Sequence, residues 1–198
     1  MTETAITVTR TTRETDISLS LSPEASDREA VKIDTEVPFF DHMLTAMAFH
    51  GGFGLELSAR GDIGVDYHHL VEDTGLVLGE AFHRLLEKST AVMRFGNALI
   101  PMDDALSEAA IDVAERACLA YHAQFPQEHA GDFPLALLKE FFYAFAQKAR
   151  VTLHLICRYG DNSHHMAEAL FKAFGKSLRQ AYTPVTGSRE NMSTKGTL

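Results

Sequence analysis

Apolar and polar residues alternate in two different periods along the first ninety residues. Every second residue is apolar in the segments read as strands, the period of a half-buried strand. An apolar stripe at helical spacing follows Pro38 and ends at Gly51-Gly52, which predicts a helix with proline in its first turn. The elements predicted in this half are strands over 5–9, 15–22 and 53–60 and helices over 38–50 and 68–88.

The same order of predicted strands and helices occurs in the second half of the chain. The elements predicted there are strands over 109–113, 117–125 and 151–157 and helices over 133–148 and 163–182. Because the order strand, strand, helix, strand, helix occurs twice, we expect an internally duplicated fold that mixes helices and strands, of the α/β (α+β) class. The boundaries that follow are a first half-repeat at 1–92, a second at 93–182 and a polar tail at 183–198, all within one domain.

Composition narrows the class of protein. The 198 residues carry a formal net charge of −9, which argues against a general nucleic-acid binder, whose affinity comes from neutralising phosphates. No apolar run reaches the roughly 20 residues that cross a bilayer, so we expect no membrane segment. Two cysteines, Cys118 and Cys157, form no CxxC pair and no disulfide framework, which predicts a reducing, cytoplasmic location.

The strongest chemical signal is a motif that occurs twice. His68-His69-x-x-Glu72 and His164-His165-x-x-Glu168 lie 96 residues apart, each at the predicted start of a helix. Residues three and four apart share a helix face, so each glutamate can converge with a histidine of its own motif. Adjacent histidines point about 100° apart, so they more naturally serve two different metal ions than one. Two facing motifs would form a two-metal centre.

The donor atoms restrict the metal. Imidazole nitrogen with carboxylate oxygen and no thiolate suits Mn²⁺, Fe²⁺ or catalytic Zn²⁺. Each half offers one further donor on its first helix: His42 lies 26 residues before His68, and Glu140 lies 24 residues before His164. Each is either an extra ligand or an ordinary surface residue, and the sequence leaves both readings open.

Basic residues indicate an anionic group on the ligand. Arginine and hydroxyl side chains are suitable phosphate ligands. Candidates are Arg94, Arg116, Lys172 and the tail segment Ser193-Thr194-Lys195-Gly196, which lacks the Walker pattern. Taken singly, each is also an ordinary surface charge.

Six short motifs follow one another along the chain. They are Phe39-Phe40-Asp41-His42-Met43-Leu44, Asp66-x-His68-His69-x-x-Glu72-Asp73, Pro101-Met102-Asp103-x-Ala105-Leu106, Leu153-His154, Asn162-x-His164-His165-x-x-Glu168-x-x-Phe171-Lys172-Ala173 and Ser193-Thr194-Lys195-Gly196-x-Leu198. In these motifs the chain resembles the imidazoleglycerol-phosphate dehydratase family of histidine biosynthesis, from about residue 7 to the last residue. The resemblance implies an internally duplicated two-layer sandwich, each half a four-stranded sheet backed by two helices. It also implies a large symmetric homo-oligomer with active sites between subunits.

The resemblance also implies roles for particular residues. Two Mn²⁺ ions per active site would be held by His42, His69, His165 and Glu168, and by His68, Glu72 and His164, with Glu140 standing where many members have histidine. Glu14 would be an acid/base residue that contacts substrate, sharing proton transfer with Glu72 or Glu168, and His50 would lie near the substrate hydroxyls. The phosphate would be bound by Arg94, Arg116, Lys172, Ser193, Thr194 and Lys195. This chain departs from the family at Ala46, where glutamine is common, and at Ala114-Glu115-Arg116-Ala117.

The implied reaction explains why two metals are needed. The proton lost from imidazoleglycerol phosphate lies on a carbon without a neighbouring carbonyl, so the imidazole ring is the available electron reservoir. An imidazolate bridging two metals would stabilise that charge, and the product would be imidazoleacetol phosphate. The sequence is also compatible with two other classes. One is a dinuclear metal hydrolase, and the other is a non-catalytic assembly protein whose motifs bind metal ions that link the subunits. No nucleic-acid or membrane partner is expected.

Overall fold

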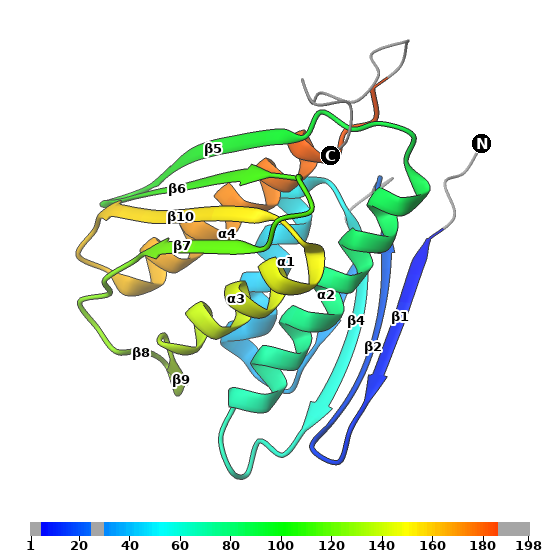
Figure 1. Cartoon of the computed structure of the whole chain (residues 1–198). Helices are drawn as coiled ribbons and strands as arrows, with labels where there is room; N and C mark the ends of the chain where they lie inside the picture. Colours follow the sequence, from blue (N-terminus) through cyan, green and yellow to red (C-terminus); the bar gives the residue numbers. More distant parts are fainter. Residues whose placement is uncertain (1–4, 25–29, 186–198) are drawn as a thin grey trace.

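Two sheets enclose four helices in the computed structural model, which describes residues 5–24 and 30–185 (Figure 1). The first half holds β1 (Ile6–Thr11), β2 (Thr15–Ser22), β3 (Val31–Asp34), α1 (Pro38–Gly51), β4 (Gly54–Gly61) and α2 (His68–Lys88). The second half holds β5 (Phe95–Met102), β6 (Ala105–Asp112), β7 (Cys118–His122), β8 (His129–Ala130), β9 (Phe133–Pro134), α3 (Leu137–Ala149), β10 (Thr152–Tyr159) and α4 (Ser163–Ala181).

The two four-stranded sheets have the same topology. Their strand orders are β1-β2-β4-β3 and β5-β6-β10-β7. In each sheet the last strand in that order pairs in parallel with its neighbour, β3 with β4 and β7 with β10, and the remaining pairs are antiparallel. A parallel pair needs a crossover connection, and α1 and α3 supply it. The predicted fold class, an internally duplicated α/β sandwich with a four-stranded sheet and two helices in each half, is confirmed, and each sheet is mixed.

The helices of the two halves pack against each other between the sheets. α1 packs on α4, and α2 packs on α3. Glycine permits the close approach, because a Cβ built on Gly175 would lie 2.1 Å from the Met47 carbonyl oxygen and one on Gly79 would lie 2.6 Å from that of Phe145. Gly79 and Gly175 are 96 residues apart, the same spacing as the two motifs, so the two helix pairs use the same contact.

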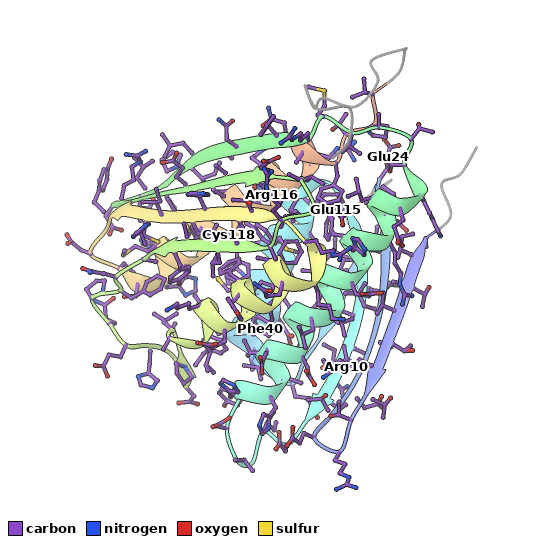
Figure 2. All side chains as sticks on the ribbon, in the orientation of Figure 1. Arg10, Glu24, Phe40, Glu115, Arg116 and Cys118 are labelled. Atoms are coloured by element: carbon purple, nitrogen blue, oxygen red, sulfur yellow. The ribbon has the colours of Figure 1, made fainter. Side chains whose placement is uncertain are left out.

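The core is rich in aromatic side chains that connect the two halves. Phe141 and Phe171 stack with ring centroids 5.6 Å apart, and Phe40 meets Phe141 edge-on at 5.4 Å. All three rings are fully buried, and Phe40 points into the interior between the sheets in Figure 2. Such offset and edge-on pairs add to the stabilisation that burial itself provides. No helix in the described ranges has the length and apolar character that a bilayer span requires.

The sequence prediction differs from the structure in several elements, and the strand predicted over 109–113 begins earlier, at Ala105. The helix predicted over 133–148 begins only at Leu137, because Phe133 and Pro134 form β9, which pairs with β8. The strand predicted over 117–125 is shorter, Cys118–His122. Strands β3 and β5 were not predicted from the hydrophobic pattern at all.

Candidate metal centre

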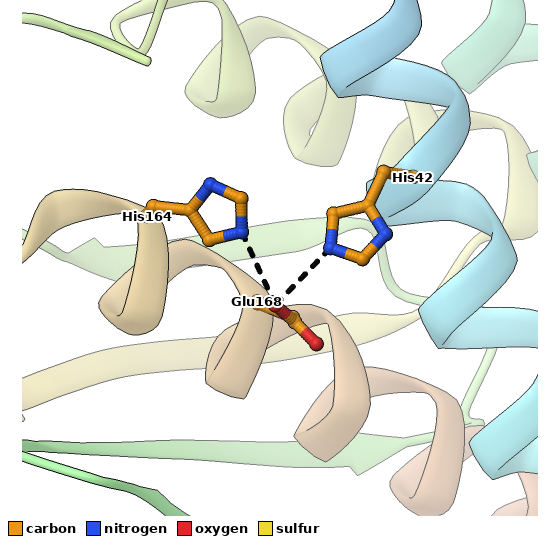
Figure 3. Close-up of side chains that lie close together, drawn as sticks. All are labelled: His42, His164 and Glu168. Atoms are coloured by element: carbon orange, nitrogen blue, oxygen red, sulfur yellow. Dashed lines mark hydrogen bonds and ion pairs between the residues drawn. The ribbon is translucent and has the colours of Figure 1, made fainter.

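Three side chains from two helices converge where α4 begins (Figure 3). His42 of α1 and His164 of α4 both direct Nε2 at the same oxygen, Oε2 of Glu168, at 3.1 and 3.2 Å. Their potential ligand atoms all lie within 4.8 Å of one another. Within the described ranges, this is the one group of three or more such residues close enough to share an ion.

Local structure explains the convergence. Asn162 caps α4, and its side-chain oxygen accepts hydrogen bonds from the backbone N–H groups of His164 and His165. The helix then places His164 and Glu168 one turn apart on the same face. His42 reaches them from α1 because that helix crosses α4 at the Gly175 contact.

The charge on Glu168 is fixed by its neighbours. The residue is only 8% exposed, and its second oxygen, Oε1, lies 2.8 Å from the Lys172 ammonium. Burial alone would raise the pKa of Glu168, but the hydrogen bonds from Lys172 and His42 outweigh it and hold the pKa below its usual value. Glu168 is therefore a carboxylate at neutral pH, with one oxygen used by lysine and the other facing two imidazoles.

The first-half motif has the same geometry in a more open form. His68 Nε2 lies 3.6 Å from Glu72 Oε2 across one turn of α2. The two side chains are 43% and 41% exposed, and among the described residues no lysine pairs with Glu72, because Leu76 stands at the position equivalent to Lys172. The backbone N–H of His68 donates to Asp66 at 2.7 Å, which fixes the start of the helix.

The second histidine of each motif turns to an aspartate. His69 Nδ1 lies 3.0 Å from Asp62 Oδ2, and His165 Nδ1 lies 2.6 Å from Asp104 Oδ1. The hydrogen bond with Asp62 raises the pKa of His69, an effect that partial burial opposes. Neither aspartate was predicted as functional. Asp104 occupies the unassigned position of the Pro101-Met102-Asp103-x-Ala105 motif, and only its tertiary contact reveals it.

Glu14 lies in the turn between β1 and β2, beside the first-half motif. Its Oε2 is 3.8 Å from His69 Nδ1, beyond hydrogen-bond distance, and its side chain is 55% exposed. The backbone is held, because the carbonyl of Glu14 accepts the N–H of Asp62 and Thr12 accepts the N–H of Glu14. His50, on α1, is half-buried, and burial with the nearby Lys172 and Lys176 lowers its pKa.

Two of the predicted phosphate ligands, Arg94 and Arg116, lie toward the far end of α4, whereas Lys172 lies beside Glu168. Arg94 forms two contacts with Asp112, at 2.7 and 3.2 Å, and Arg116 approaches the same carboxylate at 3.5 Å. The Arg94 backbone N–H donates to the carbonyl of Ala181, the last residue of the helix that starts beside His164. Figure 2 shows Glu115 and Arg116 at the end of the second sheet opposite the β10–α4 loop.

Other predicted site residues lie apart from the cluster. Glu140, on α3, lies half-buried along a groove with Lys139, Arg158 and Tyr159, and among the described residues it joins no metal-like group with His68 or Glu72. In one chain His69 and His165 also lie outside the His42–His164–Glu168 group, although the resemblance placed them with His42 and placed His164 with His68. Ser193, Thr194 and Lys195 fall outside the described residues.

The donor set fits a divalent transition metal. Two imidazole nitrogens and one carboxylate oxygen match the ligands of Mn²⁺, Fe²⁺ and catalytic Zn²⁺, and three protein ligands leave positions open for substrate. The lowered pKa of Glu168 supports the same reading, since a ligating carboxylate must be ionised.

Comparison with known proteins agrees with this chemistry. A sequence profile of imidazoleglycerol-phosphate dehydratase matches residues 35–178. The chain belongs to the imidazoleglycerol-phosphate dehydratase family. It is 47% identical over 190 residues to the imidazoleglycerol-phosphate dehydratase of Gluconobacter oxydans, covering 96% of this chain and 95% of that one. The Methanosphaerula palustris dehydratase is 45% identical over 192 residues, covering 96% and 97%.

Solved structures of the imidazoleglycerol-phosphate dehydratase family share the fold. The Staphylococcus aureus enzyme superposes with a TM-score of 0.82 at 35% identity, covering 91% of this chain and 99% of that chain. The Pyrococcus furiosus enzyme, solved in complex with (S)-C348, gives 0.82 at 37% identity, covering 96% and 100%. The family predicted from the motifs is thus confirmed, and the chain is a dehydratase, a hydro-lyase.

Proposed function

We propose that this chain removes water from imidazoleglycerol phosphate to give imidazoleacetol phosphate in histidine biosynthesis. The observation that carries the proposal is the convergence of His42, His164 and Glu168 at one copy of a duplicated motif, in a chain of this family. A ring with two nitrogens suits a centre that offers open metal positions. The two cysteines are free thiols, which supports the predicted cytoplasmic location.

Two Mn²⁺ ions per active site belong to the same proposal. The proposed ligands are His42, His68, His69, Glu72, Glu140, His164, His165 and Glu168. A metal bound there supplies Lewis acidity to the substrate ring nitrogens, which stabilises negative charge in the imidazole. Lys172 holds Glu168 ionised for that purpose.

Proton transfer is assigned to the less constrained carboxylates. Glu168 has both oxygens engaged, one by Lys172 and one by two imidazoles, so it is poorly suited to move a proton. Glu14 is exposed and makes no hydrogen bond to His69, so it is free to accept a proton from substrate. Glu72, half-exposed at 3.6 Å from His68, is the motif glutamate that can share the transfer.

Turnover and metal content test this proposal together. Purified protein with Mn²⁺ is expected to form imidazoleacetol phosphate, to bind two metal ions per chain and to lose activity to a chelator until Mn²⁺ is restored. Glu14→Gln is expected to bind the same metal and lose turnover. Release of inorganic phosphate instead would indicate a hydrolase. A change of assembly size on metal removal, with no turnover at any metal content, would indicate a metal-stapled assembly protein.

The position of the arginines supports a homo-oligomer with shared active sites. From His164 to Ala181, beside which Arg94 lies, α4 rises about 25 Å. The short glycerol chain between imidazole and phosphate cannot span that distance. Arg94 and Arg116 of one copy would therefore complete the site formed by His42, His164 and Lys172 of another, with the tail residues Ser193, Thr194 and Lys195 as further phosphate ligands.

Mixing inactive variants tests the shared site. His42→Ala and Arg94→Ala are each expected to be inactive alone, and co-assembly of the two chains is expected to restore activity, since some sites then draw both residues from intact copies. A chain carrying both substitutions, mixed with either single variant, is the control and should restore less. Failure of the single variants to complement in proven mixed oligomers would place both residues in one chain's site.

A further inference from the structure

We propose that Asp62 and Asp104 are positioning residues that hold the second histidine of each motif with Nε2 open to metal. This inference rests on the proposed function, since it concerns how the metal ligands are prepared. Each aspartate accepts a hydrogen bond from a ring Nδ1, and neither is among the proposed metal ligands, acid/base residues or phosphate ligands.

The ring chemistry determines what such a contact does. A neutral imidazole carries a proton on one nitrogen and a lone pair on the other, and a carboxylate partner only accepts. With Nδ1–H donated to aspartate, the lone pair is on Nε2, the atom available to bind a metal. His165 Nε2 lies 3.7 Å from Asp103 Oδ2, beyond hydrogen-bond distance. The first histidines, His68 and His164, instead direct Nε2 at the glutamate of their own motif.

Asp62 is held firmly enough to orient His69. It directly follows β4, its backbone N–H donates to the Glu14 carbonyl at 3.1 Å, and its own carbonyl accepts the N–H of Val65 at 2.8 Å. Its two carboxylate oxygens lie 3.2 and 3.0 Å from His69 Nδ1. The ring therefore faces a fixed acceptor.

Asp104 has a second duty in the other half. Its Oδ1 lies 2.6 Å from His165 Nδ1, while its Oδ2 accepts the backbone N–H groups of Asp161 at 2.6 Å and Asn162 at 3.0 Å. These hydrogen bonds lower the pKa of Asp104, with the His165 bond the largest cause. One carboxylate thus fixes both the imidazole and the loop that starts α4.

The two halves reach this contact from different chain positions. Glu14 directly precedes β2 and Asp104 directly precedes β6, so they are equivalent turn residues of the two sheets. In the second half, Asp104 itself holds the ring, and the residue that directly follows β10, as Asp62 follows β4, is Gly160, which has no carboxylate. In the first half, Asp62 holds the ring, and Glu14 stays 3.8 Å away. Asp62 therefore releases Glu14 for proton transfer.

Mn²⁺ affinity without substrate tests the positioning role directly. Asp62→Ala and Asp104→Ala are each expected to weaken one Mn²⁺ binding event by about 10- to 100-fold, the usual cost of losing a partner of a metal-bound histidine. Asp62→Asn keeps a neutral acceptor and should fall between wild type and Asp62→Ala. Asp132→Ala, at an exposed turn between β8 and β9, is the matched control and should leave affinity unchanged.

A double-mutant cycle separates Asp62 from Glu14. Glu14→Gln alone should leave Mn²⁺ affinity unchanged, because Asp62 already holds His69. In the Asp62→Ala background Glu14 becomes the remaining partner, so adding Glu14→Gln should lower affinity further. Nitrogen-15 chemical shifts of the metal-free protein should also show His69 losing its Nδ1–H form in Asp62→Ala.

The outcomes distinguish this inference from the proposed function. Unchanged Mn²⁺ affinity in both alanine variants, with wild type turning over substrate, would overturn the positioning role and leave the function standing. Weakened affinity in the variants, with wild type failing to dehydrate imidazoleglycerol phosphate, would overturn the function alone. The positioning role would also be overturned if each variant, Asp62→Asn included, lost Mn²⁺ affinity only in proportion to its loss of helical signal in circular dichroism.

Discussion

Residues 68–76 and 164–172 carry the same His-His-x-x-Glu pattern at the same place in each half, yet they build unequal sites. Glu168 is buried between Lys172, His42 and His164, whereas Glu72 is 41% exposed and, in the part of the chain that the structure describes, forms an ion pair with His68 alone. The difference comes from neighbours outside the motif. Repeating a motif therefore repeats the helix start but not the electrostatic environment.

The position after each glutamate shows the same principle. Asp73 follows Glu72, whereas Ala169 follows Glu168. Asp73 is buried, accepts the Thr15 hydroxyl at 2.5 Å and pairs with Arg10 at 2.9 Å, which ties the β1–β2 hairpin to α2. Glu14 lies next to Thr15 in that hairpin. The first half thus stabilises the acid/base residue, and the second half stabilises the metal-binding carboxylate.

The largest expected contrast is between Glu168→Gln and Glu72→Gln. Because the second-half cluster is already assembled, we expect two unequal Mn²⁺ binding events, the tighter at Glu168. Glu168→Gln should weaken the tighter event by more than about a hundred-fold, since a ligand matters at least as much as its outer partners. Glu72→Gln should affect the weaker event. Calorimetric titration checks this, and equal affinities in the wild type would contradict the comparison.

The next contrast concerns the two equivalent glycines. Gly175→Ala should cost about 3 kcal/mol of unfolding free energy, because the added methyl meets backbone rather than a movable side chain. Gly79→Ala should cost a similar amount at the other helix pair. Urea denaturation measures both. Only Gly175→Ala should separate His42 from Glu168 and weaken the tighter Mn²⁺ event. Equal loss of Mn²⁺ affinity in both variants would show that the two helix contacts do not differ in their effect on the metal cluster.

A smaller effect is expected at Asp73. Asp73→Ala leaves Thr15 and Arg10 without their partner, which should cost about 2 kcal/mol of stability. It should also lower turnover by releasing the hairpin that carries Glu14, while leaving the tighter Mn²⁺ event intact. Thermal unfolding, Mn²⁺ titration and turnover together check these effects, and full turnover in Asp73→Ala would show that the hairpin contact does not support the role of Glu14.

The smallest expected contrast is between the two helix starts. Asn162→Ala removes an acceptor for two backbone N–H groups of α4 and should cost about 1 kcal/mol. Asp66→Ala removes an acceptor for one, that of His68, and should cost less. Asn162→Asp keeps the acceptor and serves as control. A larger loss for Asp66→Ala in urea unfolding would reverse the expected order.

The sequence predicted what depends on local pattern. Helix starts at His68 and at Ser163, and the pairing of each glutamate with a histidine one turn away, follow from spacing alone. β5 escaped detection because its large apolar residues Phe95 and Leu99 face outward, 52% exposed each, while Gly96 lies on the inner face. β3 is only four residues long, and the charged residues Lys32 and Asp34 make up half of it.

Contacts between distant segments were beyond the sequence. Asp104 meets His165 from 61 residues away, and His42 meets Glu168 from 126 residues away. The contact of Lys172 with Glu168 was within reach, because the two residues are four apart on one helix. Lys172 was predicted only as a phosphate ligand, since its basic charge was considered without that neighbour.

The packing of each half's helices against those of the other half has a consequence for folding. α1 packs against α4 and α2 packs against α3, so each half of the chain alone would expose the apolar faces of its two helices. If the chain is divided between the two half-repeats, each fragment alone should remain unfolded, and the two should fold only when they are mixed. Since His42 and Glu168 belong to different fragments, binding of a divalent cation by the mixture would show that the two fragments have assembled.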